Sequence, residues 1–297
     1  MGHGDSSAVG NGTAYVPRCR TIRRMYEHTS PFHRLAVTDN NGVRLLKFER
    51  NQQSSMRLDD PFDTDIEYVA YFHIALAVQP AATRVLVIGL GGGSVVKRMW
   101  RDYPEMRIDA VEIDAEVAEV AFELFALPRD ERIGVFVGDG REYVRTTNET
   151  YDIIIIDAFD DDHVPPHLLT EEFLRELRDR LAENGVVAFN LIGSVHGEHS
   201  KPFRSFFRTV SNVWRNVWMF PVGLWANGPI QLAYGCNIVL LASDVELSAE
   251  ELLVRIAQRV EGRVSVKSFG LLGKDLYQGQ IRSGDVPLLL DPPSRRR

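Results

Sequence analysis

The stretch VLVIGLGGGS, residues 85–94, decides the fold class. Its first four residues form a continuous apolar run, as expected of a strand that is buried on both faces of a parallel sheet. A turn rich in glycine follows, and a helical pattern continues to Asp102. Glycine lets the backbone approach a ligand closely, and the helix that follows presents its free amide groups. The stretch therefore predicts the first strand, turn and helix of a ligand-binding α/β unit.

The same rhythm continues toward the C-terminus. Helices are expected after Asp114, where apolar residues recur on one face, and after Thr170. Strands alternating with helices indicate a mostly parallel sheet with helices on both faces, which is a Rossmann-like fold. Four further strand-like runs support this, at residues 108–112, 135–137, 151–156 and 185–190.

The segment before this unit has a different pattern. Two short runs, 35–38 and 43–48, flank a turn of Asp, Asn and Gly residues and predict an antiparallel hairpin. A helix over 66–78 leads into the first parallel strand. We therefore predict a disordered N-terminus (1–18), a small N-terminal β-hairpin domain (19–62) and a Rossmann-like, nucleoside-binding catalytic domain (63–297).

Composition narrows the class of protein. The chain has 297 residues, a net charge of −7 and two cysteines. The negative charge argues against nucleic acid as a partner and suits a cationic small molecule. No apolar run approaches the roughly 20 residues of a membrane span, and the N-terminus has no apolar leader. We expect a cytoplasmic protein without a membrane partner, and the cysteines suggest neither a disulfide framework nor a metal site.

Ligands of parallel sheets bind beyond the carboxyl ends of the strands, so the residues that follow each strand are the candidates for binding. The glycines of the first turn, Gly89, Gly91 and Gly93, are expected beside the cofactor. Glu112 ends the second strand, where a carboxylate can accept hydrogen bonds from both ribose hydroxyls. Asp139, next to Gly140 after the third strand, is placed to hold an adenine amino group.

Carboxylates are concentrated after the fourth strand. Asp157, Asp160, Asp161 and Asp162 lie within six residues, which should attract a cation. Asp157 adjoins the buried strand and could accept a proton from an attacking ammonium group as a general base. His163 and His167 follow and are interpreted as surface or structural residues on a segment that could cover the site.

These motifs together resemble the spermidine synthase (polyamine aminopropyltransferase) family, whose fold is of the class I methyltransferase type. The resemblance covers about residues 30–243. It rests on Ser30–His33, Gln52–Ser54, Tyr68, Val85–Gly93, Val111–Asp114, Gly138–Gly140, Asp157 with Asp160, and Leu169–Phe173.

The resemblance implies roles for particular residues. The donor would be decarboxylated S-adenosylmethionine, with Gln53 in its site, Glu112 on the ribose and Asp139 on the adenine. Asp157 would deprotonate the attacking amine, while Asp160 and Tyr68 would hold a di- or polyamine. The resemblance also implies a homodimer and no metal.

The sequence departs from the family pattern in the half that binds the amine. Gly92 stands where the family has an acid near the aminopropyl end, and Val69 stands where a glutamine is usual. The loss of the acid is expected to weaken selection for the decarboxylated donor. Two other functions therefore stay open: a methyltransferase that uses intact S-adenosylmethionine, and a nucleoside-binding protein without catalysis. Ser94, where a dinucleotide fingerprint prefers glycine, argues against an NAD-dependent dehydrogenase.

Overall fold

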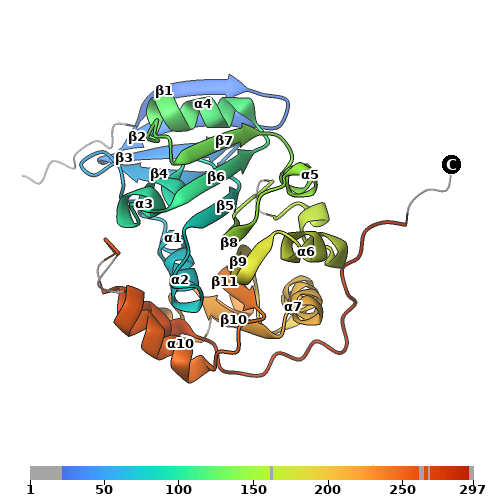
Figure 1. Ribbon diagram of the computed structural model, residues 1–297. Coiled ribbons are helices and arrows are strands. Elements are labelled where there is room, and N and C mark those ends of the chain that lie inside the picture. Colours follow the sequence, from blue (N-terminus) through green and yellow to red (C-terminus); the bar gives the residue numbers. More distant parts are fainter. Residues whose placement is uncertain (1–21, 161–162, 230, 261–263, 267, 294–297) are drawn as a thin grey trace, which may run out of the picture.

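The computed structural model describes residues 22–160, 163–229, 231–260, 264–266 and 268–293. Its N-terminal part is a four-stranded antiparallel sheet in the order β1-β2-β3-β4 (Figure 1). The predicted hairpin is confirmed, since Asn40 pairs with Val43 across the turn. The strands are β1 (Arg23–Thr29), β2 (Arg34–Asn40), β3 (Val43–Phe48) and β4 (Asn51–Arg57). The predicted disordered segment 1–18 lies outside the described residues.

The second sheet has seven strands in the order β10-β11-β9-β8-β5-β6-β7. Strands β5 to β9 pair in parallel, whereas β11 is antiparallel to both of its neighbours. This confirms the mostly parallel, Rossmann-like sheet and all five predicted strands. The strands are β5 (Arg84–Ile88), β6 (Arg107–Glu112), β7 (Ile133–Val137), β8 (Tyr151–Ile156), β9 (Leu181–Gly193), β10 (Asn216–Pro221) and β11 (Cys236–Ser243).

Helices cover both faces of this sheet (Figure 1). Val85 and Val87 of β5 pack on one side with α1, α2, α3 and α10, while Leu86 and Ile88 pack on the other side with α5, α6 and α7. The alternation of side chains along a strand explains why a continuous apolar run is needed. The helices are α1 (Tyr68–Tyr71), α2 (Ala75–Val78), α3 (Ser94–Asp102), α4 (Ala115–Leu124), α5 (Gly140–Thr146), α6 (Glu171–Arg178), α7 (Lys201–Val213), α8 (Leu224–Asn227), α9 (Gln231–Tyr234) and α10 (Ala249–Arg255).

Two of the predicted helices begin at the expected caps. Asp114 accepts a hydrogen bond from the Glu116 amide at the start of α4, and Thr170 caps α6 in the same way. The predicted helix over 66–78 is correct in place but is divided, because a 3₁₀ turn over Phe72–Ile74 separates α1 from α2.

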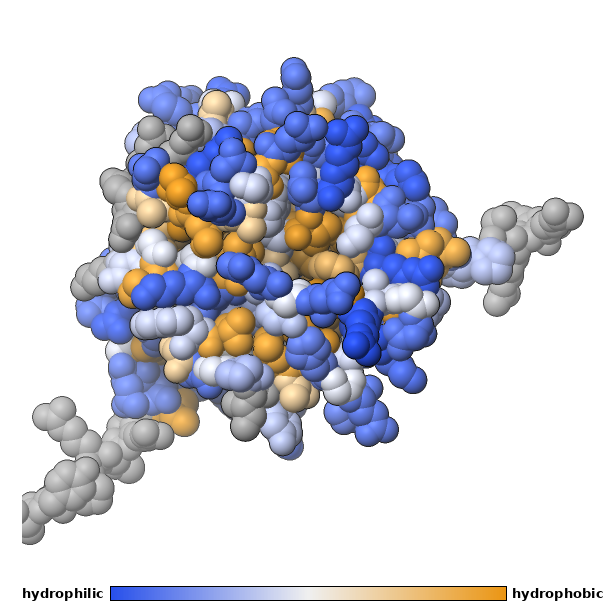
Figure 2. Space-filling model, turned by 90° about the horizontal axis from the view of Figure 1, so that it is seen from below, coloured by the Kyte–Doolittle hydropathy of each residue, from blue (hydrophilic) through white to orange (hydrophobic). Residues whose placement is uncertain are grey.

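Viewed from the end of the molecule that carries β10 and α10, hydrophilic residues cover most of the surface and apolar residues gather near its centre (Figure 2).

The N-terminal sheet packs against α4 of the larger unit. Leu35, Val37 and Leu46 form one apolar cluster with Val117 and Val120 of α4. The contact is continuous with the parallel sheet through α4, so β4 is brought beside the glycine turn that precedes α3.

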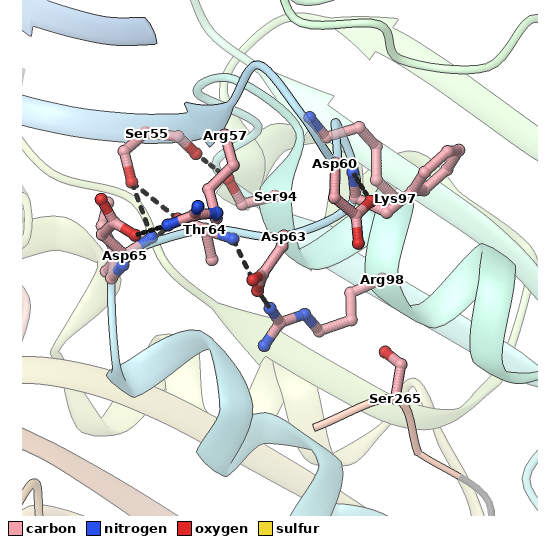
Figure 3. A network of polar contacts seen from close by, with 12 residues as sticks. Ser55, Arg57, Asp60, Asp63, Thr64, Asp65, Ser94, Lys97, Arg98 and Ser265 are labelled. Carbon is pink, nitrogen blue, oxygen red and sulfur yellow. Dashed lines mark hydrogen bonds and ion pairs between the residues drawn. The ribbon is translucent and has the colours of Figure 1, made fainter. Parts of the chain in front are cut away.

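Polar contacts fix the loop 58–66, which joins β4 to α1 (Figure 3). Arg98 of α3 donates to the Asp63 carboxylate, and the Ser94 hydroxyl donates to the Ser55 carbonyl at 3.3 Å. Arg98 is buried, so its ion pair with Asp63 is shielded from water on one side. These contacts hold the loop and the end of β4 against the helix that opens at the glycine turn.

No helix in the part of the chain that the structure describes is long and apolar enough to cross a membrane.

Candidate active site

A cavity of about 650 Å³ lies at the carboxyl ends of β5, β6, β7 and β8. It opens where the order of the parallel strands reverses, since β5 has β6 on one side and β8 on the other. Ligands of open α/β sheets bind at such a switch point. Nine predicted site residues line it: Gln53, Tyr68, Gly89, Gly91, Glu112, Asp139, Gly140, Asp157 and Asp160. The tenth, Gly93, instead forms the left-handed N-cap of α3.

The glycine turn passes very close to the end of β8. Gly89 has a φ of +95°, and a Cβ atom at this position would lie 2.3 Å from the Asp157 carbonyl oxygen. Only glycine combines this backbone conformation with so close an approach. The turn thereby places the end of β5 beside Asp157, so one cavity contains both the glycine backbone and the candidate base.

Glu112 is buried and holds the glycine turn. Its Oε2 accepts hydrogen bonds from the amides of Leu90 and Gly91, at 3.0 and 3.2 Å, and its Oε1 accepts one from Asp114 at 3.2 Å. Burial raises the pKa of Glu112, although these amides act in the opposite direction. A carboxylate has about four acceptor positions. Capacity therefore remains on Oε1 for a ligand hydroxyl.

Asp139 caps α5 and also contacts His167, one of the cavity-lining residues 163–168. Its Oδ1 accepts a hydrogen bond from the Glu142 amide at 2.9 Å, and its Oδ2 lies 2.8 Å from Nε2 of His167. Partial burial opposes ionisation, but these two bonds outweigh it and lower the pKa of Asp139. The carboxylate is thus kept charged and facing the cavity.

Asp157 lies between two polar side chains. Asn190 donates to its Oδ1 at 2.9 Å, and the Tyr68 hydroxyl donates to its Oδ2 at 3.3 Å. Desolvation nevertheless raises the pKa of Asp157 to about 7, with the two hydrogen bonds acting in the opposite direction. A base is most effective near neutral pH when its pKa lies close to 7.

The sequence interpretation did not include Asn190. It lies on β9, and Asn237 of β11 donates to its Oδ1 at 3.0 Å, which orients the amide so that Nδ2 faces Asp157. The available signal was a single polar residue at the end of the apolar run 186–189, on the strand next to β8. Polar residues at the carboxyl ends of parallel strands are candidates for a site.

Asp160 is exposed at the cavity and pairs through its backbone with His163, whose carbonyl accepts from the Asp160 amide at 2.8 Å. Asp160 and His163 both line the cavity. Asp161 and Asp162, the remainder of the predicted acidic loop, lie outside the described residues.

The charge of the cavity follows from its lining. Four carboxylates and three histidines contribute, and the described lining residues include no lysine or arginine: Glu112, Asp139, Asp157, Asp160, His33, His163 and His167. Such a lining attracts a cation and offers no side-chain cation for a phosphate or carboxylate group. Among the residues that the structure describes, no group of three His, Cys, Asp or Glu side chains could hold a metal ion.

Gly92 is not among the residues that line the cavity, and other side chains lie close to it. A Cβ atom there would lie 2.7 Å from Cδ1 of Phe125 and 2.9 Å from Cβ of Ser54, and the Gly92 amide donates to the Ser54 hydroxyl at 2.8 Å. The side chains of Phe125 and Ser54 thus occupy the space that a side chain at position 92 would need. A carboxylate at position 92 would therefore point into packed protein in this arrangement.

Replacing Gly92 by aspartate is expected to destabilise the protein rather than create a donor-binding acid. Overpacking costs about 1–3 kcal/mol, and a buried unpaired carboxylate adds to it. Thermal unfolding should show a lower midpoint for Gly92→Asp and a smaller loss for Gly92→Ala, which adds only the Cβ. A Gly92→Asp variant as stable as the parent protein would contradict this packing argument.

Known proteins resemble this chain in sequence and in fold. The model of the spermine/spermidine synthase domain matches residues 66–224. A polyamine aminopropyltransferase of Vibrio vulnificus is 32% identical over 194 residues, which span 62% of this chain and 64% of that protein. A crystal structure of a probable spermidine synthase from Corynebacterium glutamicum superposes with a TM-score of 0.69 at 20% identity, covering 92% of this chain and 98% of that one. Human methyltransferase-like protein 13 has the same fold at a TM-score of 0.56 and 24% identity, covering 67% and 92%.

The fold defines a Rossmann-like α/β protein of the class I methyltransferase type, with an acidic cavity at the switch point of its sheet. Within that class, the chain belongs to the spermine/spermidine synthase family, because the domain model covers more than half of its length. The predicted family and fold class are thereby confirmed.

Proposed function

We propose that the protein transfers an aminopropyl group from decarboxylated S-adenosylmethionine to a di- or polyamine. The main support is the environment of Asp157: the pKa of its carboxyl group is raised to about 7, and other acidic residues line the same cavity. The acidic lining suits two cationic substrates, and the relatives are named polyamine aminopropyltransferases. No metal is required for this chemistry.

The chain's own residues would supply positioning and one proton transfer. Asp157 takes a proton from the ammonium group of the acceptor, and the freed nitrogen lone pair attacks the carbon bonded to the sulfonium. That C–N bond forms as the C–S bond breaks, and the sulfur leaves as a neutral thioether. The departing group needs no acid, so one base and close approach suffice.

The positions of the lining residues support a binding role for each of them. Glu112 would accept from the ribose and Asp139 from the adenine amino group, while Gln53 and the backbone at Gly89, Gly91 and Gly140 would line the nucleoside. The Tyr68 hydroxyl, already bonded to Asp157, would hold the amine together with Asp160. Gly93 would act by opening α3 rather than by contact.

The second candidate, methyl transfer from intact S-adenosylmethionine, is favoured by Gly92, which leaves position 92 without an acid to repel the donor carboxylate. The intact donor would bring that carboxylate among the acidic side chains, with no arginine or lysine among the described lining residues to receive it. Charge complementarity thus favours the decarboxylated donor.

Calorimetric titration with both donors separates the two functions. The decarboxylated donor is expected to bind at least about tenfold more tightly, or about 1.4 kcal/mol. Preference for intact S-adenosylmethionine would instead support methyl transfer. Binding of either donor without turnover of any amine or methyl acceptor would support a nucleoside-binding protein without catalysis.

A homodimer, a cytoplasmic location and the division of the chain at residues 19–62 and 63–297 stay predictions. The division is supported by the end of β4 at Arg57 and by the loop 58–66 that follows it. Light scattering would test the dimer, and a mass of about one chain, 33.6 kDa, would contradict it.

A further inference from the structure

Residues 163–168, which line the cavity, contact the start of α5 at two points. Nε2 of His167 lies 2.8 Å from Oδ2 of Asp139, and the His167 carbonyl accepts a hydrogen bond from Nη1 of Arg141 at 3.1 Å. Because an ionised carboxylate only accepts hydrogen bonds, Nε2 carries the proton in this pair. His167 therefore fixes the Asp139 carboxylate from the side opposite to the Glu142 amide.

Arg141 is buried and fully engaged. It forms bidentate pairs with Glu176 of α6, at 2.8 and 2.9 Å, and with Asp291 near the C-terminus, at 2.7 Å for both bonds. Bidentate arginine–carboxylate pairs hold both partners in one plane and in one orientation. The guanidinium thus cannot turn away from His167 without breaking several charged bonds.

Asp291 is itself held in place. Its Oδ1 accepts from the Thr170 hydroxyl at 2.8 Å, and its amide donates to Glu172 at 2.9 Å. Thr170 is the N-cap of α6 and Glu172 lies in its first turn, directly after the cavity-lining residues 163–168. Asp291, 152 positions beyond Asp139 in the chain, thus helps to hold the residues around the proposed adenine site.

We propose that His167 is a positioning residue for nucleobase selection, held in place through its backbone by Arg141 and Asp291. The inference rests on the proposed function, because it assumes that Asp139 receives the base. Oδ2 of Asp139 has a second acceptor position, so an adenine amino group can bind there while His167 stays bonded. A 6-oxo purine would place an acceptor against this fixed carboxylate and be repelled. Selection depends on the orientation of this carboxylate, which the bond from His167 helps to hold.

The test compares methylthioadenosine with methylthioinosine by calorimetry; the second has an oxygen in place of the 6-amino group and a proton on the neighbouring N1. The parent protein is expected to prefer methylthioadenosine at least about tenfold, the scale of one hydrogen bond to a charged group. His167→Ala should reduce that preference severalfold, because it weakens the binding of methylthioadenosine and leaves that of methylthioinosine unchanged. His167→Gln, whose side chain can still donate a hydrogen bond, should keep part of the preference for methylthioadenosine. Asp291→Asn should reduce this preference less than His167→Ala does.

His196→Ala is the matched control, because His196 bonds to Tyr277 and is not among the residues lining the cavity. A merely structural role of His167 would lower both affinities equally and leave their ratio unchanged, which would overturn the inference while leaving nucleoside binding in place. Tighter methylthioadenosine binding by His167→Ala would also overturn it, since His167 would then compete with the base. Failure of the parent protein to bind either nucleoside would contradict the proposed function itself.

Discussion

Replacement of Asp157 by asparagine is expected to lower kcat by about 10²–10⁴-fold, the usual contribution of a general base. Asparagine keeps the shape of the side chain and can still accept from Asn190, which donates to Oδ1 at 2.9 Å. It cannot take a proton from the acceptor amine. Affinity for methylthioadenosine, measured by calorimetry, should therefore change little while turnover is lost.

The pH profile gives the same residue a second test. The unprotonated form of Asp157 is the active one, and its pKa is about 7. The rate should therefore rise about tenfold for each pH unit below 7 and level off above it, if no other group limits the rate. A profile that is flat between pH 5.5 and about 8 would remove Asp157 from the mechanism.

The stability of Asp157→Asn serves as a control for folding. Because the folded-state pKa of Asp157 is raised, the folded protein binds more protons than the unfolded chain between the ordinary Asp value and about 7. Its ionisation therefore costs stability as the pH rises through that window. The asparagine variant should unfold at the same temperature as the parent or higher at pH 8, so that lost turnover is not lost structure.

Glu112→Gln is expected to weaken nucleoside binding by about 1.5–3 kcal/mol, the scale of a hydrogen bond to a charged group. Two effects combine. The variant loses the anionic acceptor proposed for the ribose, and its amide NH₂ replaces one of two oxygens that accept from the turn and from Asp114. The glycine turn should therefore loosen as well.

Glu119→Gln, on the exposed side of α4, is the matched control and should leave affinity unchanged. Calorimetry with methylthioadenosine measures both variants. Equal affinity of Glu112→Gln and the parent protein would show that the ribose is held elsewhere. A comparable loss for ribose and 2′,3′-dideoxyribose analogues would locate the effect in the turn rather than in a ribose contact.

Much of the parallel sheet could be predicted from sequence because its strands are buried on both faces. Such strands require continuous apolar runs, and the residues at their carboxyl ends then share one edge of the sheet. Glu112, Asp139 and Asp157 could be placed in one cavity on that basis. Strand β1 (RRMYEHT) and strand β4 (NQQSSMR) carry no such run, so two strands of the N-terminal sheet were not predicted.

What the sequence could not provide were contacts between distant residues. In the sequence, Gly92 is only a departure from the family pattern, which has an acid there. The structure places it against Phe125 and Ser54, 33 and 38 positions away. The His167–Asp139 bond and the Arg141–Asp291 pair likewise depend on how α5, α6 and the C-terminal segment pack. Spacing along the chain contains no signal for such pairs, because each partner alone is an ordinary polar residue.

The most direct test of the account is turnover with defined substrates. The protein is incubated with decarboxylated S-adenosylmethionine and a mixture of diamines and polyamines, and the products are followed by mass spectrometry. We expect methylthioadenosine together with one amine lengthened by an aminopropyl group, in equal amounts, and formed at least about 10²-fold more slowly by Asp157→Asn. A methylated product formed from intact S-adenosylmethionine, with no aminopropyl product, would contradict it.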